Sequence, residues 1–169
     1  AVFTASFVQM MHSLGQVGTD GSRGSEAWAR YKTVAAGAFT CDLPAGTYET
    51  MNAKVPGIQT VPRSELWALY SLLTHQNPEI HITYYIDASY VVRAARAPSE
   101  VYSKGANGDL WTRVYALLDR LGPNVSISKV KSHITSDEEW EAHNMTFKAA
   151  LLNCGADNAA DAAAELYAE

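Results

Sequence analysis

The sequence predicts one α/β domain built on a mixed β-sheet with helices on both faces. Two observations favour this fold class. Strand-like and helix-like segments alternate along the second half of the chain, and two strand-like segments joined by a turn precede them. A hairpin followed by alternating strands and helices gives a sheet with antiparallel and parallel pairs. The length of 169 residues and the 47% hydrophobic content suit a single domain over 1–169, with 1–13 as an N-terminal extension.

The antiparallel part of the sheet is expected in the first third of the chain. A first strand, weakly marked, is expected over 14–19. Residues 31–40 combine β-branched, aromatic and small side chains, and residues 48–55 alternate loosely, as strands do. The turn-forming segment 42–46 (DLPAG) separates them. We therefore predict a β-hairpin over 31–55.

A helix, a strand and a short helix are expected next. Thr60 is a suitable N-cap, Pro62 suits the first helical turn, and leucines follow at helical spacing as far as 76–78 (QNP). Residues 80–86 (IHITYYI) give a strong strand signal. The short helix after this strand is expected to end near Arg96.

The last part of the chain is expected to contain a helix, a strand and two more helices. Asp109 opens a helix with a regular apolar stripe, which 122–123 (GP) ends, and residues 125–130 alternate as a strand. A capping box then opens an extra helix over 136–152. Gly155 is interpreted as its terminator, after which an alanine-rich helix runs to the end of the chain.

Charge is distributed unevenly along the chain, whose net charge is −5. Residues 93–131 carry seven basic residues against three acidic ones, whereas residues 132–169 carry one lysine against eight acids. A basic middle and an acidic end fit one nucleic-acid enzyme if the acids hold metal ions. A patchy surface without function is the other interpretation.

The chain shows no membrane or secretion signal. No apolar run approaches the ~20 residues of a membrane-spanning helix, and no basic region followed by an apolar run opens the sequence. Because an initiator Met is missing, we interpret the chain as an excerpt of a longer protein or a processed product. Cys41 and Cys154 lack zinc-type spacing and are expected to be reduced thiols, which favours an intracellular compartment, cytoplasmic or nuclear.

Four carboxylates are the candidate functional residues. Asp20 follows the first expected strand, although Asp-Gly alone is typical of a turn. Glu65 lies on a core-facing helical stripe, or is an exposed acid favoured by the helix N-terminus. Asp87 ends a buried strand, at the edge where open α/β sheets bind ligands. Asp161 lies early in the last expected helix with Asp157 one turn before it, and either is also interpretable as a solvated cap.

The joint placement of these acids says more than any one of them. Acids at strand ends and helix starts can meet at one end of a sheet, where their mutual repulsion is removed by divalent cations. Oxygen ligands of this kind suit Mg²⁺ or Mn²⁺. Two such ions can activate water and stabilise the leaving oxygen in a phosphodiester cleavage.

The sequence resembles the ribonuclease H family, in its bacterial and retroelement type. Six segments carry the match, in the family's order over 19–165: TDGS (19–22), RSEL (63–66), IDASYV (86–91), NGDLW (107–111), VKSH (130–133) and DNAAD (157–161). The resemblance implies a five-stranded mixed sheet and metal-dependent cleavage of the RNA strand of RNA–DNA hybrids, leaving 3′-hydroxyl and 5′-phosphate ends. It also makes attachment to a reverse transcriptase polyprotein plausible.

The resemblance implies a role for each candidate residue. The metal-binding acids are Asp20, Glu65, Asp87 and Asp161, which would hold two Mg²⁺ ions, with Mn²⁺ as a substitute. His133 would assist proton transfer or product release, with His143 as an alternative, and Trp111 would pack in the core. The substrate contacts are expected at Ser22, Arg63, Ser89, Arg93 and Lys104, and basic residues from Arg93 to Arg120 would hold the phosphates of the DNA strand.

The sequence also departs from the family's pattern. Val61-Pro62 stands where asparagines are common before the Arg-x-Glu segment, and Ser89 stands where glutamine is common, so selection of the RNA strand is less well supported than metal binding. His133 and Asp161 lie 28 positions apart, against about ten in compact members. The extra 136–152 helix either restricts the entry of the hybrid or packs at the periphery.

Two other functions stay open from the sequence. One is a related nuclease on the same fold that acts on DNA or on single strands. The other is a hybrid-binding or scaffold domain without catalysis, as in degenerate retroelement copies, although all four acids are present.

Overall fold

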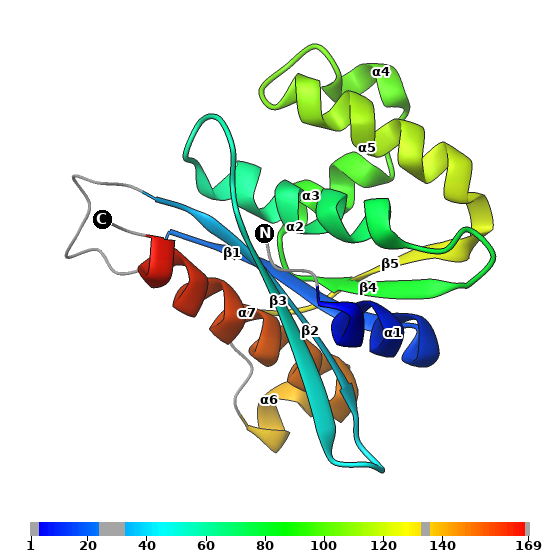
Figure 1. The fold of residues 1–169 in the computed structure, drawn as a ribbon, viewed down its shortest axis with the longest axis vertical. Helices are drawn as coiled ribbons and strands as arrows, with labels where there is room; N and C mark the ends of the chain where they lie inside the picture. The colour runs from blue at the N-terminus through cyan, green and yellow to red at the C-terminus, as the bar shows by residue number, and fades with distance from the viewer. Residues whose placement is uncertain (1–3, 24–32, 133–135, 168–169) are drawn as a thin grey trace.

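A computed structural model of the chain, which describes residues 4–23, 33–132 and 136–167, contains one five-stranded mixed sheet in the order β3-β2-β1-β4-β5 (Figure 1). β1, β2 and β3 pair antiparallel, whereas β4 pairs parallel with β1 and β5 parallel with β4. The predicted mixed sheet is confirmed. The strands are β1 Gln16–Ser22, β2 Ala35–Asp42, β3 Thr47–Lys54, β4 Ile82–Ile86 and β5 Val125–Lys129.

Helices cover both faces of the sheet, as the sequence predicts. One face carries the main core, to which α1, α2, α3 and α5 contribute, and the other face is covered by α7 (Figure 1). The helices are α1 Ala5–Leu14, α2 Val61–His75, α3 Ser89–Ala95, α4 Ser99–Tyr102, α5 Gly108–Leu121, the 3₁₀ turn η2 Gly122–Asn124, α6 Asp137–Ala142 and α7 Phe147–Tyr167.

Helix α1 lies within the segment that the sequence analysis treats as an extension. The Thr4 side chain accepts a hydrogen bond from the Phe7 amide and so caps the helix, and Gly15 ends it in the left-handed conformation. Phe7 and Met11 are fully buried in the main core. This helix therefore packs with the rest of the domain.

The C-terminal helices differ from the prediction in their bounds. The extra helix before the last one is present, but α6 ends at Ala142 rather than near residue 152. Asn144, two residues later, takes a left-handed φ of 59°. The following helix, α7, begins at Phe147 and continues through Gly155, so the predicted terminator at Gly155 is wrong. A Cβ at Gly155 would lie 2.3 Å from the Phe39 ring, which shows that this glycine serves close packing on β2.

Glycines in β1 and β2 allow α7 to lie directly on the sheet. A Cβ at Gly18 would lie 2.1 Å from the carbonyl oxygen of Leu152, and one at Gly37 would lie 2.4 Å from the amide nitrogen of Ala160. Both neighbours are backbone atoms of α7, which cannot move without shifting the helix. The depth at which α7 docks, and so the placement of its polar side chains, is set by these two positions.

Replacing Gly18 by Ala is expected to destabilise the protein by about 1–3 kcal/mol or more, since the added methyl overlaps helix backbone. Chemical denaturation of the purified chain measures this loss. Gly105→Ala is the matched control, because a Cβ at Gly105 meets nothing within 4 Å. Equal denaturation midpoints for the two variants would contradict the close packing.

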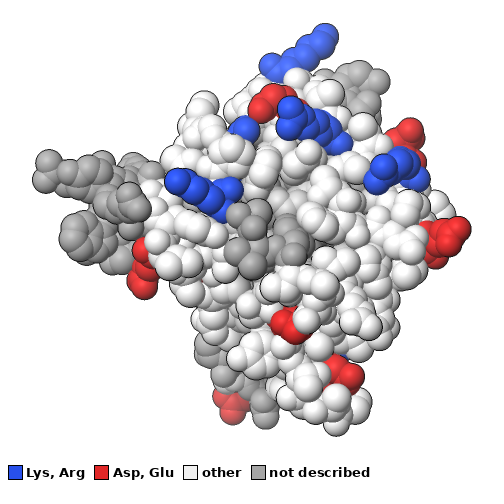
Figure 2. All heavy atoms as spheres, in the orientation of Figure 1, with Lys and Arg blue, Asp and Glu red and all other residues white. Residues whose placement is uncertain are grey.

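The uneven charge distribution is visible on the surface. On the face drawn in Figure 2, lysines and arginines lie in the upper half, over α4, α5 and the start of α2. The charged residues in the lower half of this view are acidic. Within the described part of the chain, no helix has the length and apolar character needed to cross a membrane.

Candidate metal centre

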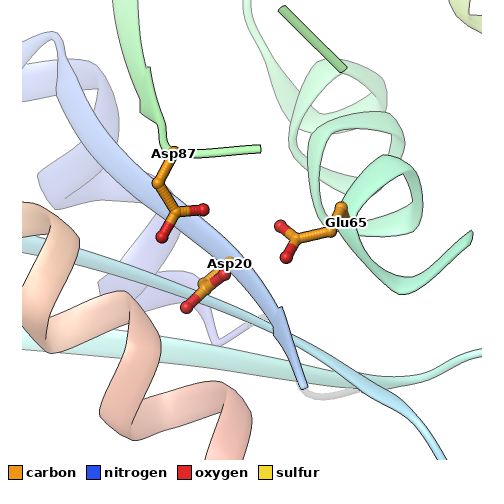
Figure 3. A group of neighbouring side chains, drawn as sticks. All are labelled: Asp20, Glu65 and Asp87. Atoms are coloured by element: carbon orange, nitrogen blue, oxygen red, sulfur yellow. The ribbon is translucent and has the colours of Figure 1, made fainter. Parts of the chain in front are cut away.

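Three carboxylates from separate parts of the chain meet at one end of the sheet. Asp20 lies in β1, Asp87 directly follows β4, and Glu65 lies in the second turn of α2. Because Thr19 pairs with Ile86 in the parallel β1–β4 ladder, Asp20 and Asp87 occupy neighbouring positions. One ligand oxygen from each of the three acids lies within 4.8 Å of the others, and Figure 3 shows the carboxylates pointing toward one another.

The approach of Glu65 depends on local features that the sequence encodes. Thr60 accepts a hydrogen bond from the Arg63 amide and caps α2, and a proline lies in the first turn. A Cβ at Gly21 would lie 2.2 Å from Ser64 Oγ and 2.6 Å from the Glu65 amide nitrogen. Gly21 therefore lets the first turn of α2 pack against β1, which brings Glu65 close to Asp20, the residue before Gly21.

Burial and crowding shift the protonation of two of these acids. Asp20 is 4% exposed and Glu65 is 8% exposed. Burial, followed by the charges of Glu65 and Asp87 and a hydrogen bond with Asp157, raises the pKa of Asp20 strongly. Burial, followed by the charge of Asp87, likewise raises the pKa of Glu65. Without a cation, burial and crowding therefore favour the protonated forms of these two acids.

The cluster fits a divalent cation. Its donors are carboxylate oxygens, the ligands that Mg²⁺ and Mn²⁺ prefer. Glu65 Oε2 is buried and has no hydrogen-bond partner within the described part of the chain. A buried carboxylate oxygen without a partner is costly, and a bound cation would remove that cost.

Helix α7 adds a row of three polar residues across this end of the sheet. The row consists of Asn153, Asp157 and Asp161, which are four residues apart and so lie on one helix face. The Asn153 amide donates a hydrogen bond of 3.2 Å to Asp87 Oδ2. Asp157 hydrogen bonds with Asp20, and its charge raises the pKa of Glu65. Asp157 therefore belongs to the electrostatic neighbourhood of the cluster.

Asp161 lies one turn farther along α7 and, like Asp157, lies outside the group of three acids. It is exposed, and its Oδ1 accepts a hydrogen bond of 2.5 Å from the Ser22 hydroxyl. Sequence reasoning placed Asp161 among the metal ligands and named Asp157 only as its neighbour. It missed Asn153, whose only available signal is the four-residue spacing from Asp157.

Arg63, an expected substrate contact, makes contacts within the protein instead. It is only 9% exposed. Its guanidinium binds both carboxylate oxygens of Asp109 at 3.1 and 3.2 Å, Asn107 Oδ1 at 3.2 Å and the Pro56 carbonyl at 2.8 Å. The hydrogen bonds from Arg63 lower the pKa of Asp109. Arg63 thus ties the first turn of α2, directly before Glu65, to the start of α5.

The other expected site residues differ in their surroundings. Ser89 and Arg93 are exposed on α3, just after Asp87, and Lys104 is exposed before α5. His133 lies outside the described residues. Trp111 is fully buried and donates a hydrogen bond of 2.6 Å to the Tyr90 hydroxyl, which agrees with the expected packing role.

Metal binding is expected to depend on pH, because the cation competes with protons. The pKa of Glu65 is raised from 4.5 to about 8, so its protonated form stabilises the folded chain, and this contribution is lost as pH rises through about 8. Without metal, thermal stability should therefore fall between pH 5 and pH 9, while the stabilisation by added Mg²⁺ should grow. Thermal unfolding in EDTA and in Mg²⁺ across this range measures both trends. A metal-induced stabilisation of equal size at every pH would contradict the assignment.

Comparisons with known proteins identify the fold. No family model and no curated protein matches the chain. The solution structure of the ribonuclease H domain of prototype foamy virus aligns with a TM-score of 0.64 at 18% identity, over 90% of this chain and 94% of that one. LC11-RNase H1, isolated from compost by a metagenomic approach, aligns with a TM-score of 0.59 at 16% identity, over 89% and 95%.

Two further structures extend the likeness. LC11-RNase H1 in complex with an RNA/DNA hybrid aligns with a TM-score of 0.57 at 14% identity, over 89% of this chain and 96% of that one. The prototype foamy virus protease–reverse transcriptase aligns with a TM-score of 0.64 at 16% identity, where this chain covers 20% of that longer protein. The chain thus has the ribonuclease H fold.

Proposed function

We propose that this chain is a ribonuclease H, a metal-dependent endonuclease that hydrolyses the RNA strand of RNA–DNA hybrids. The observation that carries the proposal is the buried cluster of Asp20, Glu65 and Asp87, with a carboxylate oxygen of Glu65 that lacks a partner among the described residues. The ribonuclease H fold supports the substrate class, since one protein with this fold was solved with an RNA/DNA hybrid.

The acids would hold two Mg²⁺ ions, and Mn²⁺ would substitute for them. Asp20, Glu65 and Asp87 would hold the ions, and Asp157, which hydrogen bonds with Asp20, would complete the ligand set in place of Asp161. When bound, such ions would supply a nucleophilic water and would stabilise the leaving oxygen. The reaction forms a bond from the water oxygen to phosphorus and breaks the P–O3′ bond, which leaves 3′-hydroxyl and 5′-phosphate ends.

The remaining residues of the site hold these ligands in place. Asn153 fixes the orientation of Asp87 through its side-chain amide. The contact of Arg63 with Asp109 anchors the helix turn that carries Glu65. Partners of this kind orient metal ligands, and their loss typically lowers metal affinity about 10–100-fold. His133, which lies outside the described residues, would assist proton transfer or product release, as the family resemblance implies.

The test is cleavage of a hybrid whose RNA strand is labelled, in Mg²⁺ and in EDTA. Cutting of the RNA in Mg²⁺ alone, lost in Asp87→Asn, supports the proposal. Cleavage that survives Asp87→Asn would show that the cluster is not the active site. Mass analysis of the products identifies the predicted 3′-hydroxyl and 5′-phosphate ends.

The alternative function is a nuclease of the same fold that acts on another substrate, and two departures in the sequence support it. Val61-Pro62 and Ser89 replace residues through which the family commonly contacts RNA, so selection of the RNA strand rests on fewer side chains. A panel of hybrid, duplex RNA, duplex DNA and single strands separates the two functions. Hybrid binding without turnover in Mn²⁺ would instead indicate a domain that binds without catalysis.

A further inference from the structure

A basic pocket lies beside the metal centre, between α3 and β5. It has a volume of about 390 Å³ and is open to solvent. Its lining consists of Ser89, Val92, Arg93, Arg96, Ala97 and Lys129. The lining contains three cations, no acid and no aromatic side chain, which is a composition suited to an anion rather than to a stacked base.

The cations of the pocket are exposed, and two of them donate hydrogen bonds to backbone carbonyls in β5 or directly after it. Arg96 donates a hydrogen bond of 2.9 Å to the Ile127 carbonyl, and Lys129 donates one of 2.7 Å to the Val130 carbonyl. A guanidinium has five N–H donors and an ammonium has three, so each keeps donors for a ligand. Within the described part of the chain, no carboxylate forms an ion pair with Arg93, Arg96 or Lys129.

The pocket lies at the same end of the sheet as the metal centre, because its lining residues neighbour β4 and Asp87. Ser89 lies two residues after Asp87, and Lys129 pairs with Ile86 across the parallel ladder. Ser89, Arg93 and Arg96 lie on one face of α3 and its C-cap, over a rise of roughly 10 Å. Such a length spans neighbouring phosphates of one nucleic-acid strand.

We propose that this pocket binds successive backbone phosphates of the strand whose scissile phosphate lies at the acidic cluster, whereas the family resemblance assigns Arg93 to the phosphates of the DNA strand. The proposal rests on the proposed function and extends it, because it gives the substrate a second contact region along α3 beyond the point of cleavage. Phosphate contacts fix the register of a nucleic acid without reading its sequence. The pocket would thus position the strand, while the carboxylates hold the metal ions.

The experiment measures the binding of the full chain to a fluorescein-labelled RNA–DNA hybrid in EDTA, by fluorescence anisotropy at several salt concentrations. Replacing Arg93, Arg96 and Lys129 together by Gln is expected to flatten the slope of log K against log salt by about 2.7, at 0.9 for each lost phosphate contact. Arg93→Gln alone, which disturbs no hydrogen bond among the described residues, is expected to flatten it by about 0.9. Lys148→Gln removes the same charge beside Cys41, near the N-terminal end of α7, and is the matched control.

The outcomes separate this proposal from the proposed function, because cleavage in Mg²⁺ is measured in parallel. Slopes that flatten in the pocket variants but not in Lys148→Gln support the pocket. If the hybrid is cut but Arg93→Gln has the same slope as Lys148→Gln, the pocket proposal is wrong and the nuclease assignment stands. If no substrate is cut yet the pocket variants flatten the slope, the phosphate site stands and the nuclease assignment fails. If no substrate is cut and no pocket variant changes the slope, both proposals fail.

Discussion

Replacing Asp20 by Asn is expected to abolish cleavage and, at the same time, to make the metal-free protein more stable. Asp20 is buried and interacts with Glu65, Asp87 and Asp157, so its carboxyl group would be the most central ligand of a bound metal. Losing several kcal/mol of metal-assisted stabilisation of the transition state corresponds to a rate lower by about 10³-fold. In EDTA the Asp20 carboxyl group ionises more easily in the unfolded chain than in the folded one, which favours unfolding. Asn lacks this group and should therefore stabilise the folded chain.

The sign of the stability change follows from this pKa difference. Burial and the neighbouring acids raise the pKa of Asp20, so the stability that its proton contributes is present at acid pH and is lost as pH rises. Asn cannot ionise, and its advantage over Asp should therefore grow from pH 5 to pH 9. A gain of about 1 kcal/mol would raise the melting temperature by about 2–4 °C in a chain of this size.

A matched acid outside the site provides the control for both measurements. Asp42 accepts a hydrogen bond of 3.2 Å from the Ala45 amide in the β2–β3 turn and is remote from the cluster in the sheet. Asp42→Asn should leave cleavage unchanged and should not stabilise the chain in EDTA. An Asp20→Asn variant that keeps a tenth of the activity, or that melts lower than the original chain in EDTA, would contradict the role given to Asp20.

The fold could be predicted where local signals and tertiary packing agree. The turn at 42–46 and the alternating residues on both sides of it predict a hairpin that the structure confirms as β2 and β3. The prediction was wrong at Gly155, because a glycine in a helical pattern usually signals an end. Here the missing side chain accommodates the Phe39 ring from a strand more than 100 residues earlier. A contact of that kind has no local signal, so the continuity of α7 required the structure.

The site shows the same division between local and long-range information. Asp20 and Asp87 could be singled out because each follows an expected strand, and Glu65 because it lies on an apolar helical stripe, although β1 in fact continues through Asp20 to Ser22. The family resemblance names Asp161 as the fourth ligand, but the spacing alone does not separate it from Asp157, since residues four apart share a helix face. It depends on how α7 lies on Gly18 and Gly37, which brings Asp157 to Asp20 and leaves Asp161 at Ser22.

Asp157→Asn and Asp161→Asn are therefore expected to have very different effects. Asp157 hydrogen bonds with Asp20, and its charge acts on Glu65, so its loss should lower both Mg²⁺ affinity and cleavage by about 10–100-fold or more. Asp161 is exposed and contacts the Ser22 hydroxyl, so its loss should change either quantity by less than about threefold. Both substitutions keep the size of the side chain and stay within α7.

Two readouts decide between the acids. Isothermal titration with Mg²⁺ reports whether a ligand is lost, and cleavage of the labelled hybrid at saturating Mg²⁺ reports whether the remaining ligands still support the reaction. A larger effect in Asp161→Asn than in Asp157→Asn would reverse the assignment and restore the ligand set expected from the sequence. Equal, small effects in both would mean that Asp20, Glu65 and Asp87 suffice, because only these three converge within 4.8 Å among the described residues.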